Sequence, residues 1–552
     1  MRAERVMTPS IPVGPAERLS GTRATAAYVV LGLWAAYLLT APTSGFAWID
    51  SWHNEQRAVQ VILLSLTTLV LASLASFSPE RVLARIQFPW WWWAFVALGT
   101  ISALASQLPF AAFAEIGLFL MLSALVMLTA ALTANQPERM RKVARHCALL
   151  ISMAHVLAVM VRYLAALQLG NGIDVTVFML GYANPRFASA LYAVLIPFVA
   201  GTAADSDERP ALRATAFGAL CLLWTINIGL GTRGIWFAYG LAMPAVSLLI
   251  GVRSSVRSFG AIVLAAVLGI VLYIALSTGA GDNGDGTAAA VLSGDRLRVL
   301  TSREVLWALS WDTIAQHPLL GIGPMHFATL KSHVGAHPHN WPLQVAAEWG
   351  LPALGMLLFA LCRRVLSLHK VRGMQASANA EASLAVGVAL VYGLVDGNLV
   401  MPVSQSAAAL ALGLALGGDQ APAQSKWGSV KGQLGGIALI SAVVVVCIYA
   451  QRTLEDQPRA VADFRARYPH AWLVPRFWES GLTLVALRPS ENAEQASTQR
   501  GQSCAQRFGP FTFRSDHSQD LLLGHRVSLL RHGECPQPFY VTQRLLHAIG
   551  QR

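Results

Sequence analysis

Two histidines stand just before an apolar segment of the chain. Residues 337–352 read His-Pro-His-Asn-Trp-Pro-Leu-Gln-Val-Ala-Ala-Glu-Trp-Gly-Leu-Pro. The unperturbed pKa of imidazole lies near neutrality, so His337 or His339 can take a proton from a hydroxyl nucleophile without an unusual environment. The alternative is an interfacial loop in which Trp341 and Trp349 anchor the chain at a membrane surface.

Three arginines, two of them beside apolar spans, could supply positive charge. Arg233 lies in Gly-Thr-Arg-Gly-Ile-Trp, between two spans only a few residues apart, where a charge facing lipid is costly. We therefore expect it to face a polar cavity. Arg186 begins another span, and Arg303 lies in a predicted loop helix. Guanidinium groups bind phosphate oxygens bidentately and stay charged, so several can neutralise a pyrophosphate without a metal. The alternative for each is snorkelling to lipid headgroups.

A membrane domain has to position these residues. The chain has 552 residues, of which 55% are hydrophobic and 13% charged, and its mean hydropathy is +0.49. No ordinary soluble domain has these values. We predict an all-α polytopic membrane protein with about 12–13 transmembrane helices. The predicted spans are 25–42, 58–76, 88–105, 110–134, 147–169, 186–203, 214–231, 235–251, 259–279, 349–362, 380–400, 405–417 and 433–450, of which 349–362 and 405–417 are short enough to be re-entrant.

The distribution of basic residues predicts the orientation. About half of the 41 Lys and Arg fall in the N-terminal segment and in alternate short loops, which are cytoplasmic by the positive-inside rule. The net charge of +12 is therefore largely a topology signal, and it indicates no nucleic-acid partner. The predicted organisation is a cytoplasmic segment 1–24, helices over 25–279, a large external loop 280–349, further helices over 350–450 and an external C-terminal region 451–552.

The two large external segments differ in character. Within the loop, the apolar spacing over 301–316 predicts an amphipathic helix. The region 451–552 contains arginine but no lysine, which suits an interfacial helix followed by a small domain, and it holds no catalytic motif. Cys504 and Cys535 lie in it, and we expect a disulfide between them in an oxidising compartment.

The motifs together resemble the O-antigen ligase superfamily, which includes O-antigen ligases, polysaccharide polymerases and bacterial protein O-oligosaccharyltransferases. The resemblance covers roughly 180–365 and is most specific in its last motif. It rests on Thr-Arg-Gly at 232–234, Arg-x-x-x-Trp at 303–307, His-Pro-Leu-Leu-Gly-Ile-Gly at 317–323, and His339-Asn340 with nine residues before Gly350-Leu351-Pro352.

What the resemblance implies is a GT-C-type membrane glycosyltransferase that inverts the anomeric centre and needs no metal or cofactor. It would move a glycan from undecaprenyl diphosphate to an acceptor hydroxyl at the periplasmic face of a bacterial inner membrane, among membrane lipids. The expected acceptor is lipid A-core in lipopolysaccharide biosynthesis, and a protein or a growing polysaccharide is the alternative. The implied site residues are the catalytic His339, the pyrophosphate-binding Arg233, Arg303 and Arg186, and the supporting Asn340, His337 and Gly350.

Two other classes of function remain open from the sequence. A transporter of lipid-linked sugars is favoured only by His155 and Arg162 inside the span 147–169, because intramembrane charges are usually functional. The chain has no internal repeat of the kind that transporters often show. A metal-dependent glycosyltransferase would use a carboxylate-rich site in the first external loop, formed by Asp50, His53 and Glu55.

Overall fold

The computed structural model describes residues 22–43, 49, 51–77, 89–169, 175–279, 303–330, 335–370, 380–417, 428–467 and 475–478. The predicted disulfide between Cys504 and Cys535 lies outside the described residues, as do Asp50 and most of the segment 1–24. The chain divides into a unit of residues 1–484 and a unit of residues 485–552. All described residues belong to the first unit.

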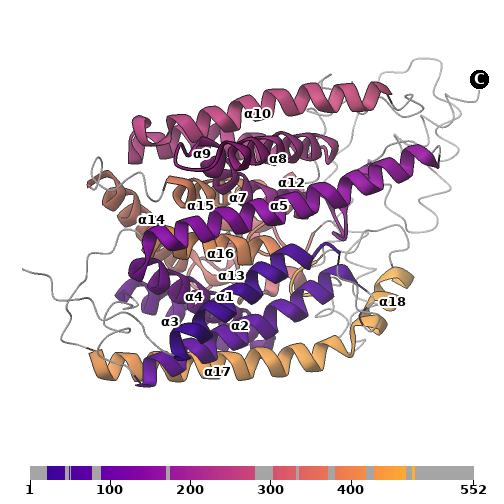
Figure 1. The fold of residues 1–552 in the computed structure, drawn as a ribbon. Helices are drawn as coiled ribbons and strands as arrows, with labels where there is room; N and C mark the ends of the chain where they lie inside the picture. The colour runs from indigo at the N-terminus through magenta and orange to yellow at the C-terminus, as the bar shows by residue number, and fades with distance from the viewer. Residues whose placement is uncertain are drawn as a thin grey trace, which may run out of the picture. The chain divides into compact units, whose positions relative to one another are not determined.

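Every regular element in the described residues is a helix, and no strand occurs among them (Figure 1). The elements that coincide with predicted spans are α1 (Thr22–Thr40), α2 (Trp52–Phe77), α3 (Trp90–Ala105), α4 (Pro109–Asn135), α5 (Pro137–Gln168), α7 (Pro185–Ala204), α8 (Pro210–Gly229), α9 (Arg233–Ile250), α10 (Val252–Gly279), α14 (Leu351–Lys370), α15 (Ala380–Tyr392), α16 (Pro402–Gly417) and α17 (Gly428–Leu454). The remaining elements are α6 (Val175–Met179), α12 (Arg303–Gln316), the 3-10 turn η2 (His326–Thr329), α13 (Trp341–Trp349) and α18 (Gln457–Arg467).

Within the described residues, 9 helices are long and apolar enough to cross a membrane. The shorter apolar helices α1, α3, α15 and α16 account for the other predicted spans. The prediction of an all-α fold is confirmed for the described residues, and the nine long apolar helices among them fit the predicted multi-pass architecture. The span at 349–362 was expected to be short, but α14 runs to Lys370 and is one of the nine.

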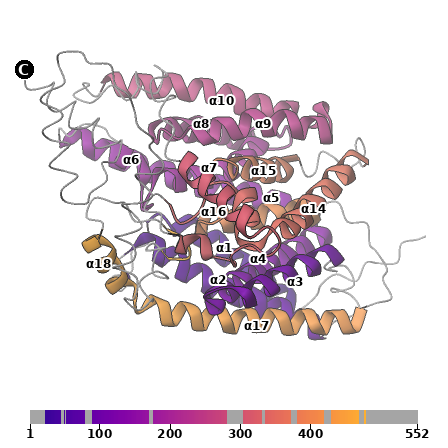
Figure 2. The same ribbon diagram turned by 180° about the vertical axis from the view of Figure 1, so that it is seen from behind.

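The helix α7 forms the centre of the bundle. Every residue from Ala188 to Thr202 is buried, because α5, α8, α15 and α16 pack around it. The helix α10 lies along one flank of the bundle and α17 along the opposite flank, and both views agree on this arrangement (Figures 1 and 2). A helix of this length spans about 30 Å, so residues at the two ends of α7 belong to opposite ends of the bundle.

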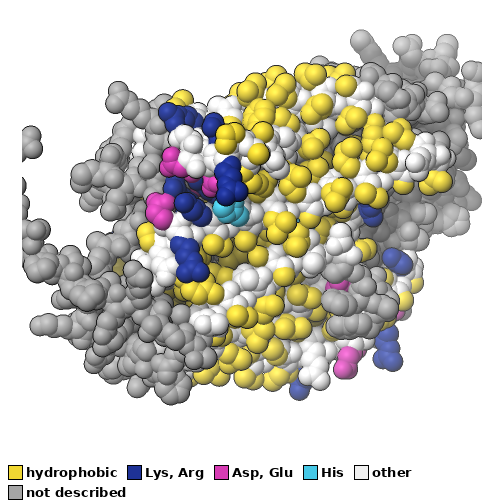
Figure 3. All heavy atoms as spheres, in the orientation of Figure 1, with side chains coloured by type: hydrophobic (Ala, Val, Ile, Leu, Met, Phe, Trp, Pro, Cys, Tyr) yellow, Lys and Arg dark blue, Asp and Glu magenta, His cyan; other side chains and the backbone are white. Residues whose placement is uncertain are grey.

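The long sides of the bundle and the ends where α7 begins and stops differ in the kind of side chain that they carry. The outer faces of α5 and α10 expose large apolar side chains such as Leu157 and Val267. Figure 3 shows a broad hydrophobic surface, with charged side chains gathered at one end of the view, near the start of α5. The start of α5 also carries the ion pair of Arg141 with Glu138 and the buried Arg145, which pairs with Asp205 just after the C-terminus of α7. This pattern suits helices that face lipid along their length and water at their ends.

Among the boundaries that differ from the sequence prediction, two bear on the candidate site. The predicted span 380–400 stops at Tyr392, and residues 393–401 form turns before α16. The predicted start of the second span at 58 is too late, because α2 begins at Trp52 and its first turns carry buried polar side chains. The helix predicted at 301–316 is confirmed as α12.

Candidate functional site

A buried carboxylate lies at the centre of the residues that the sequence singled out. Asp396, in the turn after α15, is only 6% exposed. Its oxygens lie 3.9 Å from Nε of Arg186, 3.6 Å from Nη2 of Arg303 and 3.7 Å from Nδ1 of His339. Residues from three distant parts of the chain thus meet at one acidic group, which the sequence analysis had placed inside an apolar span.

Each basic residue of this cluster stands at or near the N-terminus of its helix. Arg186 is the second residue of α7, and the side chain of Asn184 caps that helix by accepting a hydrogen bond from the Arg186 N–H. Arg303 is the first described residue of α12, and His339 immediately precedes Asn340, which caps α13. The N-terminus of a helix carries partial positive charge and unpaired N–H groups, so these ends add to the attraction for an anion.

Arg233 belongs to the same electrostatic neighbourhood. Burial lowers the pKa of Arg303, and Arg186 and Arg233 lower it further because like charges lie close by, while the Asp396 carboxylate opposes them. Arg233 is exposed at the first position of α9 and sits at the end of the bundle that holds Asp396. The expectation that it faces a polar region is consistent with this position.

The Thr-Arg-Gly sequence has a structural basis at each residue. The Thr232 hydroxyl donates to Ser189 at 2.6 Å, and Ser189 donates in turn to the Asn227 side chain at 2.6 Å, all three being buried. A Cβ at Gly234 would lie 2.2 Å from the ring of Tyr392, so only glycine admits that ring. The turn is therefore fixed on both sides of the arginine.

The two histidines have different environments. The His337 ring is buried against Gly397, where a Cβ would lie 2.1 Å from its Cε1, and its centroid lies 4.2 Å from that of His339. Burial, together with the charges of His339, Arg476 and other cations, holds the pKa of His337 well below its usual value. His337 is therefore neutral at neutral pH, and its Nδ1 accepts a hydrogen bond from the His339 N–H at 3.3 Å.

His339 is held in an unusual backbone conformation. Its φ is +53°, in the left-handed region that residues other than glycine seldom adopt, and such conformations cluster at functional sites. Its side chain is 18% exposed, so the ring is accessible to a ligand while the ring of His337 is enclosed. Nδ1 of His339 and Nε of Arg303 are buried and have no hydrogen-bond partner among the described residues.

The loop that carries His339 is fastened to the turn that carries Asp396. The Asn340 side chain donates to the Leu394 carbonyl at 3.0 Å and accepts from the Leu343 N–H as the cap of α13. The Trp341 N–H donates to the Gly393 carbonyl at 2.9 Å, and its indole donates to Leu390. Asn340 is thus a structural support for the site, and Trp341 is no lipid anchor.

Gly350 and Trp349 shape the C-terminal end of α13. Gly350 has φ +91°, and a Cβ there would lie 2.2 Å from the Leu319 carbonyl oxygen, so glycine is required where α13 turns into α14. Trp349 is 5% exposed and stacks on Phe95 at 4.7 Å. The alternative reading of Trp341 and Trp349 as membrane anchors is therefore wrong.

The protonation of Asp396 follows from its neighbours. Burial alone would raise its pKa, but His339, Arg186 and Arg303 outweigh that effect and hold the pKa of the carboxyl below its usual range. Asp396 is therefore ionised at neutral pH. It faces Nδ1 of His339, the arrangement in which a carboxylate keeps a proton on Nδ1 and leaves Nε2 free to accept one.

The cluster has the parts needed for displacement of a phosphate leaving group by a hydroxyl. Three guanidinium groups and one carboxylate leave an excess of positive charge where four helices begin. An imidazole oriented by a carboxylate stands next to them, as a general base would. Charge that develops on an anionic leaving group would meet fixed positive groups in a partly desolvated site.

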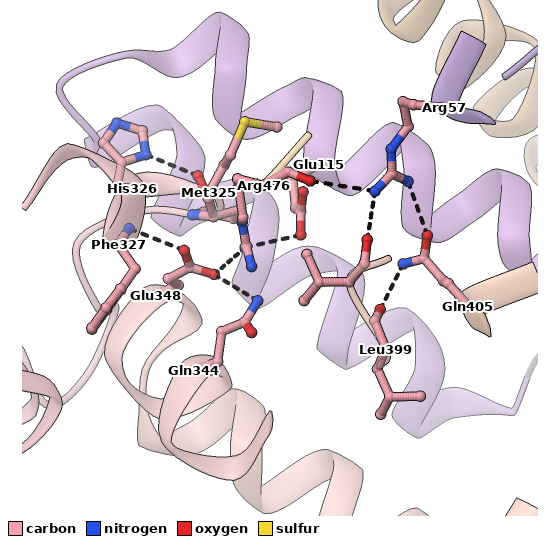
Figure 4. A network of polar contacts seen from close by, with 12 residues as sticks. Arg57, Glu115, Met325, His326, Phe327, Gln344, Glu348, Leu399, Gln405 and Arg476 are labelled. Carbon is pink, nitrogen blue, oxygen red and sulfur yellow. Dashed lines mark hydrogen bonds and ion pairs between the residues drawn. The ribbon is translucent and has the colours of Figure 1, made fainter. Parts of the chain in front are cut away.

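The sequence analysis missed a second buried polar cluster, which is drawn in Figure 4. It lies near the first, because the charge of Arg476 contributes to the lowered pKa of His337. Arg476, 1% exposed, lies between Glu348 of α13 and Glu115 of α4, at 2.6 Å and 3.1 Å from Nη2. It belongs to the short segment 475–478, far along the chain from both partners. Long-range contacts of this kind leave no local spacing in the sequence, so no motif pointed to them.

The residues behind the two alternative functions have structural partners. His53 of α2 is 1% exposed and its Nε2 faces the Phe477 carbonyl at 3.3 Å, while Glu55 is buried in the same helix. No group of three His, Cys, Asp or Glu that could hold a metal occurs within the described ranges. His155 of α5 faces the Leu39 carbonyl at 3.3 Å and packs on a tyrosine ring. Arg162 is exposed on α5.

Comparison with known families agrees with the geometry. Residues 217–358 match the family model described as O-antigen ligase. These residues form a domain similar to that of the O-antigen ligase family. This domain contains Arg233, Arg303 and His339, whereas Arg186 and Asp396 lie outside the matched residues but inside the same cluster. No curated protein matches the chain. The apolar helices and this match together indicate a multi-pass membrane protein with a domain similar to that of a family of glycosyltransferase-type enzymes.

Proposed function

We propose that the protein transfers a glycan from undecaprenyl diphosphate to an acceptor hydroxyl, and that the acceptor is lipid A-core. The observation that carries the proposal is the convergence of three arginines, the His339 imidazole and the Asp396 carboxylate at one end of the bundle. The match to the O-antigen ligase family supports the substrate class.

The arginines bind the leaving group in this proposal. Arg186, Arg233 and Arg303 engage the oxygens of the pyrophosphate, because guanidinium forks match its geometry and remain charged at any relevant pH. The buried Nε of Arg303, which lacks a hydrogen-bond partner among the described residues, supports this role. As the bond between the anomeric carbon and the phosphate oxygen breaks, the electron pair stays on undecaprenyl diphosphate, where the same groups stabilise it.

The dyad of His339 and Asp396 activates the acceptor. Nε2 of His339 takes the proton of the acceptor hydroxyl while the hydroxyl oxygen forms a bond to the anomeric carbon. Asp396 stabilises the imidazolium that results. The distance of 3.7 Å from Nδ1 to the carboxylate is longer than a hydrogen bond, and such contacts often shorten when substrate binds. Direct attack opposite the leaving group inverts the anomeric centre.

The orientation in the membrane follows from the two ends of α7. The end that carries Asp205 adjoins basic residues such as Arg139 and Arg141 at the start of α5, and a basic end is cytoplasmic by the positive-inside rule. The site around Asp396 and Arg186 belongs to the other end, which we therefore assign to the periplasmic face of the inner membrane. The N-terminus is then cytoplasmic and the C-terminus periplasmic.

A genetic experiment tests the proposed acceptor. Deleting the gene is expected to remove long-chain lipopolysaccharide while polymer accumulates on undecaprenyl diphosphate, and the wild-type gene is expected to restore it. Complementation with His339→Ala is expected to fail, whereas His317→Ala, an exposed histidine on the same loop, is expected to succeed. Accumulation of single repeats on lipid A-core would identify a polymerase instead, and loss of glycosylated protein alone would identify a protein transferase.

Chelation tests the absence of a metal requirement. Three guanidinium groups provide the positive charge that a divalent cation supplies in other glycosyl and phosphoryl transfers. Transfer by purified protein is therefore expected to continue in EDTA. Loss of transfer in EDTA with recovery on adding magnesium or manganese would contradict this part of the proposal and favour a site that includes Glu55 and His53.

A further inference from the structure

The short segment Pro475-Arg-Phe-Trp478 enters the interior of the bundle beside the candidate site. Arg476, Phe477 and Trp478 are each at most 3% exposed, although the sequence places them in a region with no catalytic motif. The Trp478 indole donates to Thr453 of α17 at 2.7 Å, and the Arg476 N–H donates to the Trp478 carbonyl at 2.9 Å. The segment is therefore fixed by its own backbone and by α17.

The side chain of Arg476 fastens the C-terminal end of α13. Its Nη2 lies 2.6 Å from Glu348, the penultimate residue of that helix, and 3.1 Å from Glu115 of α4 (Figure 4). Burial raises the pKa of the Glu348 carboxyl to about 7, and the Arg476 guanidinium opposes this effect, so Arg476 is the charged partner that favours the ionised form of this fully buried group. Glu348 also accepts a hydrogen bond from the Phe327 N–H at 3.0 Å, which extends the tie to η2.

The backbone of the same segment reaches the turn that carries Asp396. The Phe477 carbonyl accepts from Nε of Arg57 at 3.0 Å, and the Arg57 guanidinium also donates to the Val400 carbonyl, four residues after Asp396. Arg57 is 1% exposed, and oxygens of uncharged groups accept its hydrogen bonds. A buried arginine with such partners serves to join backbone segments, here α2, the segment 475–478 and the turn 393–401.

The two halves of the candidate dyad therefore share one support. The loop before α13 carries His339, and α13 is fixed at its far end by Arg476. The turn 393–401 carries Asp396 and is fixed by Arg57, which itself binds the carbonyl of Phe477. A displacement of about 1 Å at a catalytic group can cost on the order of 100-fold in rate, so this support bears directly on turnover.

We propose that Arg476 is a positioning residue of the glycan-transfer site, through which the segment 475–478 sets the separation of His339 and Asp396. The inference rests on the proposed function for its kinetic consequence, but the positioning itself can be measured without substrate. Arg476 binds no part of the donor in this account. Its removal should affect the dyad and leave the pyrophosphate-binding arginines in place.

The test compares Arg476→Gln and Arg476→Lys in the full-length protein with Arg465→Gln, an exposed arginine on α18. Hydrogen–deuterium exchange of the peptide covering 336–350 is expected to rise in Arg476→Gln and to stay at the wild-type level in Arg465→Gln. Arg476→Lys is expected to be intermediate, because an ammonium keeps the charge but cannot contact both carboxylates in the same way. Glu348→Gln removes the carboxylate that pairs with Arg476 and is expected to raise exchange in the same peptide.

Kinetics supply the second readout. Arg476→Gln is expected to lower kcat on the order of 100-fold with little change in the KM for the donor, and combining it with Glu348→Gln should cost no more than the worse single variant. Unchanged exchange at 336–350, a wild-type kcat, or an equal rise in exchange over all helices would each overturn the inference. If the wild type transfers no glycan, the proposed function fails, and the exchange result still decides whether Arg476 positions the loop.

Discussion

Replacing Asp396 by asparagine should separate the two tasks of the site. The substitution keeps the shape of the side chain and removes a charge that lies 3.7 Å from Nδ1 of His339. Both groups are mostly buried, with 6% and 18% of the side chain exposed. At this distance and an effective dielectric constant of about 20, the attraction between the carboxylate and an imidazolium is about 4.5 kcal/mol. If the transition state carries the full imidazolium charge, that energy corresponds to a loss of roughly a thousandfold in kcat.

The same substitution should act on donor binding in the opposite direction. Asp396 also lies within 3.9 Å of Arg186 and 3.6 Å of Arg303, where its negative charge offsets theirs. Removing it leaves more positive charge for the pyrophosphate, so the KM for the donor should stay the same or fall. A lower kcat with an unchanged or lower KM is the signature of a group that acts on the base and not on binding.

The assay is transfer by purified protein in lipid nanodiscs, with donor and acceptor varied separately. Asp205→Asn, which removes a carboxylate at the opposite end of α7, serves as the matched control. The reasoning is refuted if Asp396→Asn turns over at the wild-type rate, or if its whole defect is a raised KM for the donor.

Three further predictions concern the arginines, the buried histidine and the tail. Arg303→Lys should lose most of its transfer activity, because a point charge cannot reproduce a bidentate fork on phosphate; recovery to the wild-type rate would show that only net charge counts. The melting temperature of the detergent-solubilised protein should fall as the pH drops below about 6.5. The reason is that His337 binds a proton in the unfolded chain but stays neutral when it is buried in the folded protein. His337→Gln should therefore make the melting temperature depend less steeply on pH. An equal slope in the variant would contradict the burial argument. Cys504 and Cys535 should form a disulfide worth about 3 kcal/mol, and free alkylation of both thiols under non-reducing conditions would exclude it.

The sequence was sufficient to predict the helices because each span is a long apolar run. It was less able to predict where α15 ends. Asp396 and Asn398 follow Tyr392 in a stretch that is otherwise apolar, so the whole of 380–400 fitted a single span. A carboxylate inside an apolar run was the available signal, since such a charge in a membrane segment is usually functional.

The polar start of α2 was misjudged for a related reason. His53 and Arg57 are titratable and precede an apolar run, which is typical of a solvated loop. In the structure they form helical turns, because the carbonyls of Phe477 and Val400, distant in the sequence, accept their hydrogen bonds. Only tertiary contacts decide whether such a segment is buried, so local pattern could not predict it. The same holds for Arg476.

The residues of the candidate site were more accessible to prediction than their arrangement. Arg186, Arg233 and His339 could be selected because each stands beside an apolar span where charge is expensive, and Arg303 because it begins the Arg-x-x-x-Trp motif. The meeting of Arg186, Arg303 and His339 at Asp396 depends on the packing of α7, α12 and α15, which periodicity does not specify.

The most direct measurement of the central claim is transfer from a defined undecaprenyl-diphosphate glycan to purified lipid A-core, with the anomeric configuration of the product determined by NMR. The account predicts that the wild type forms a product of inverted configuration, that His317→Ala does the same, and that His339→Ala forms none while still binding the donor. Retained configuration, or transfer by His339→Ala at the wild-type rate, would contradict it.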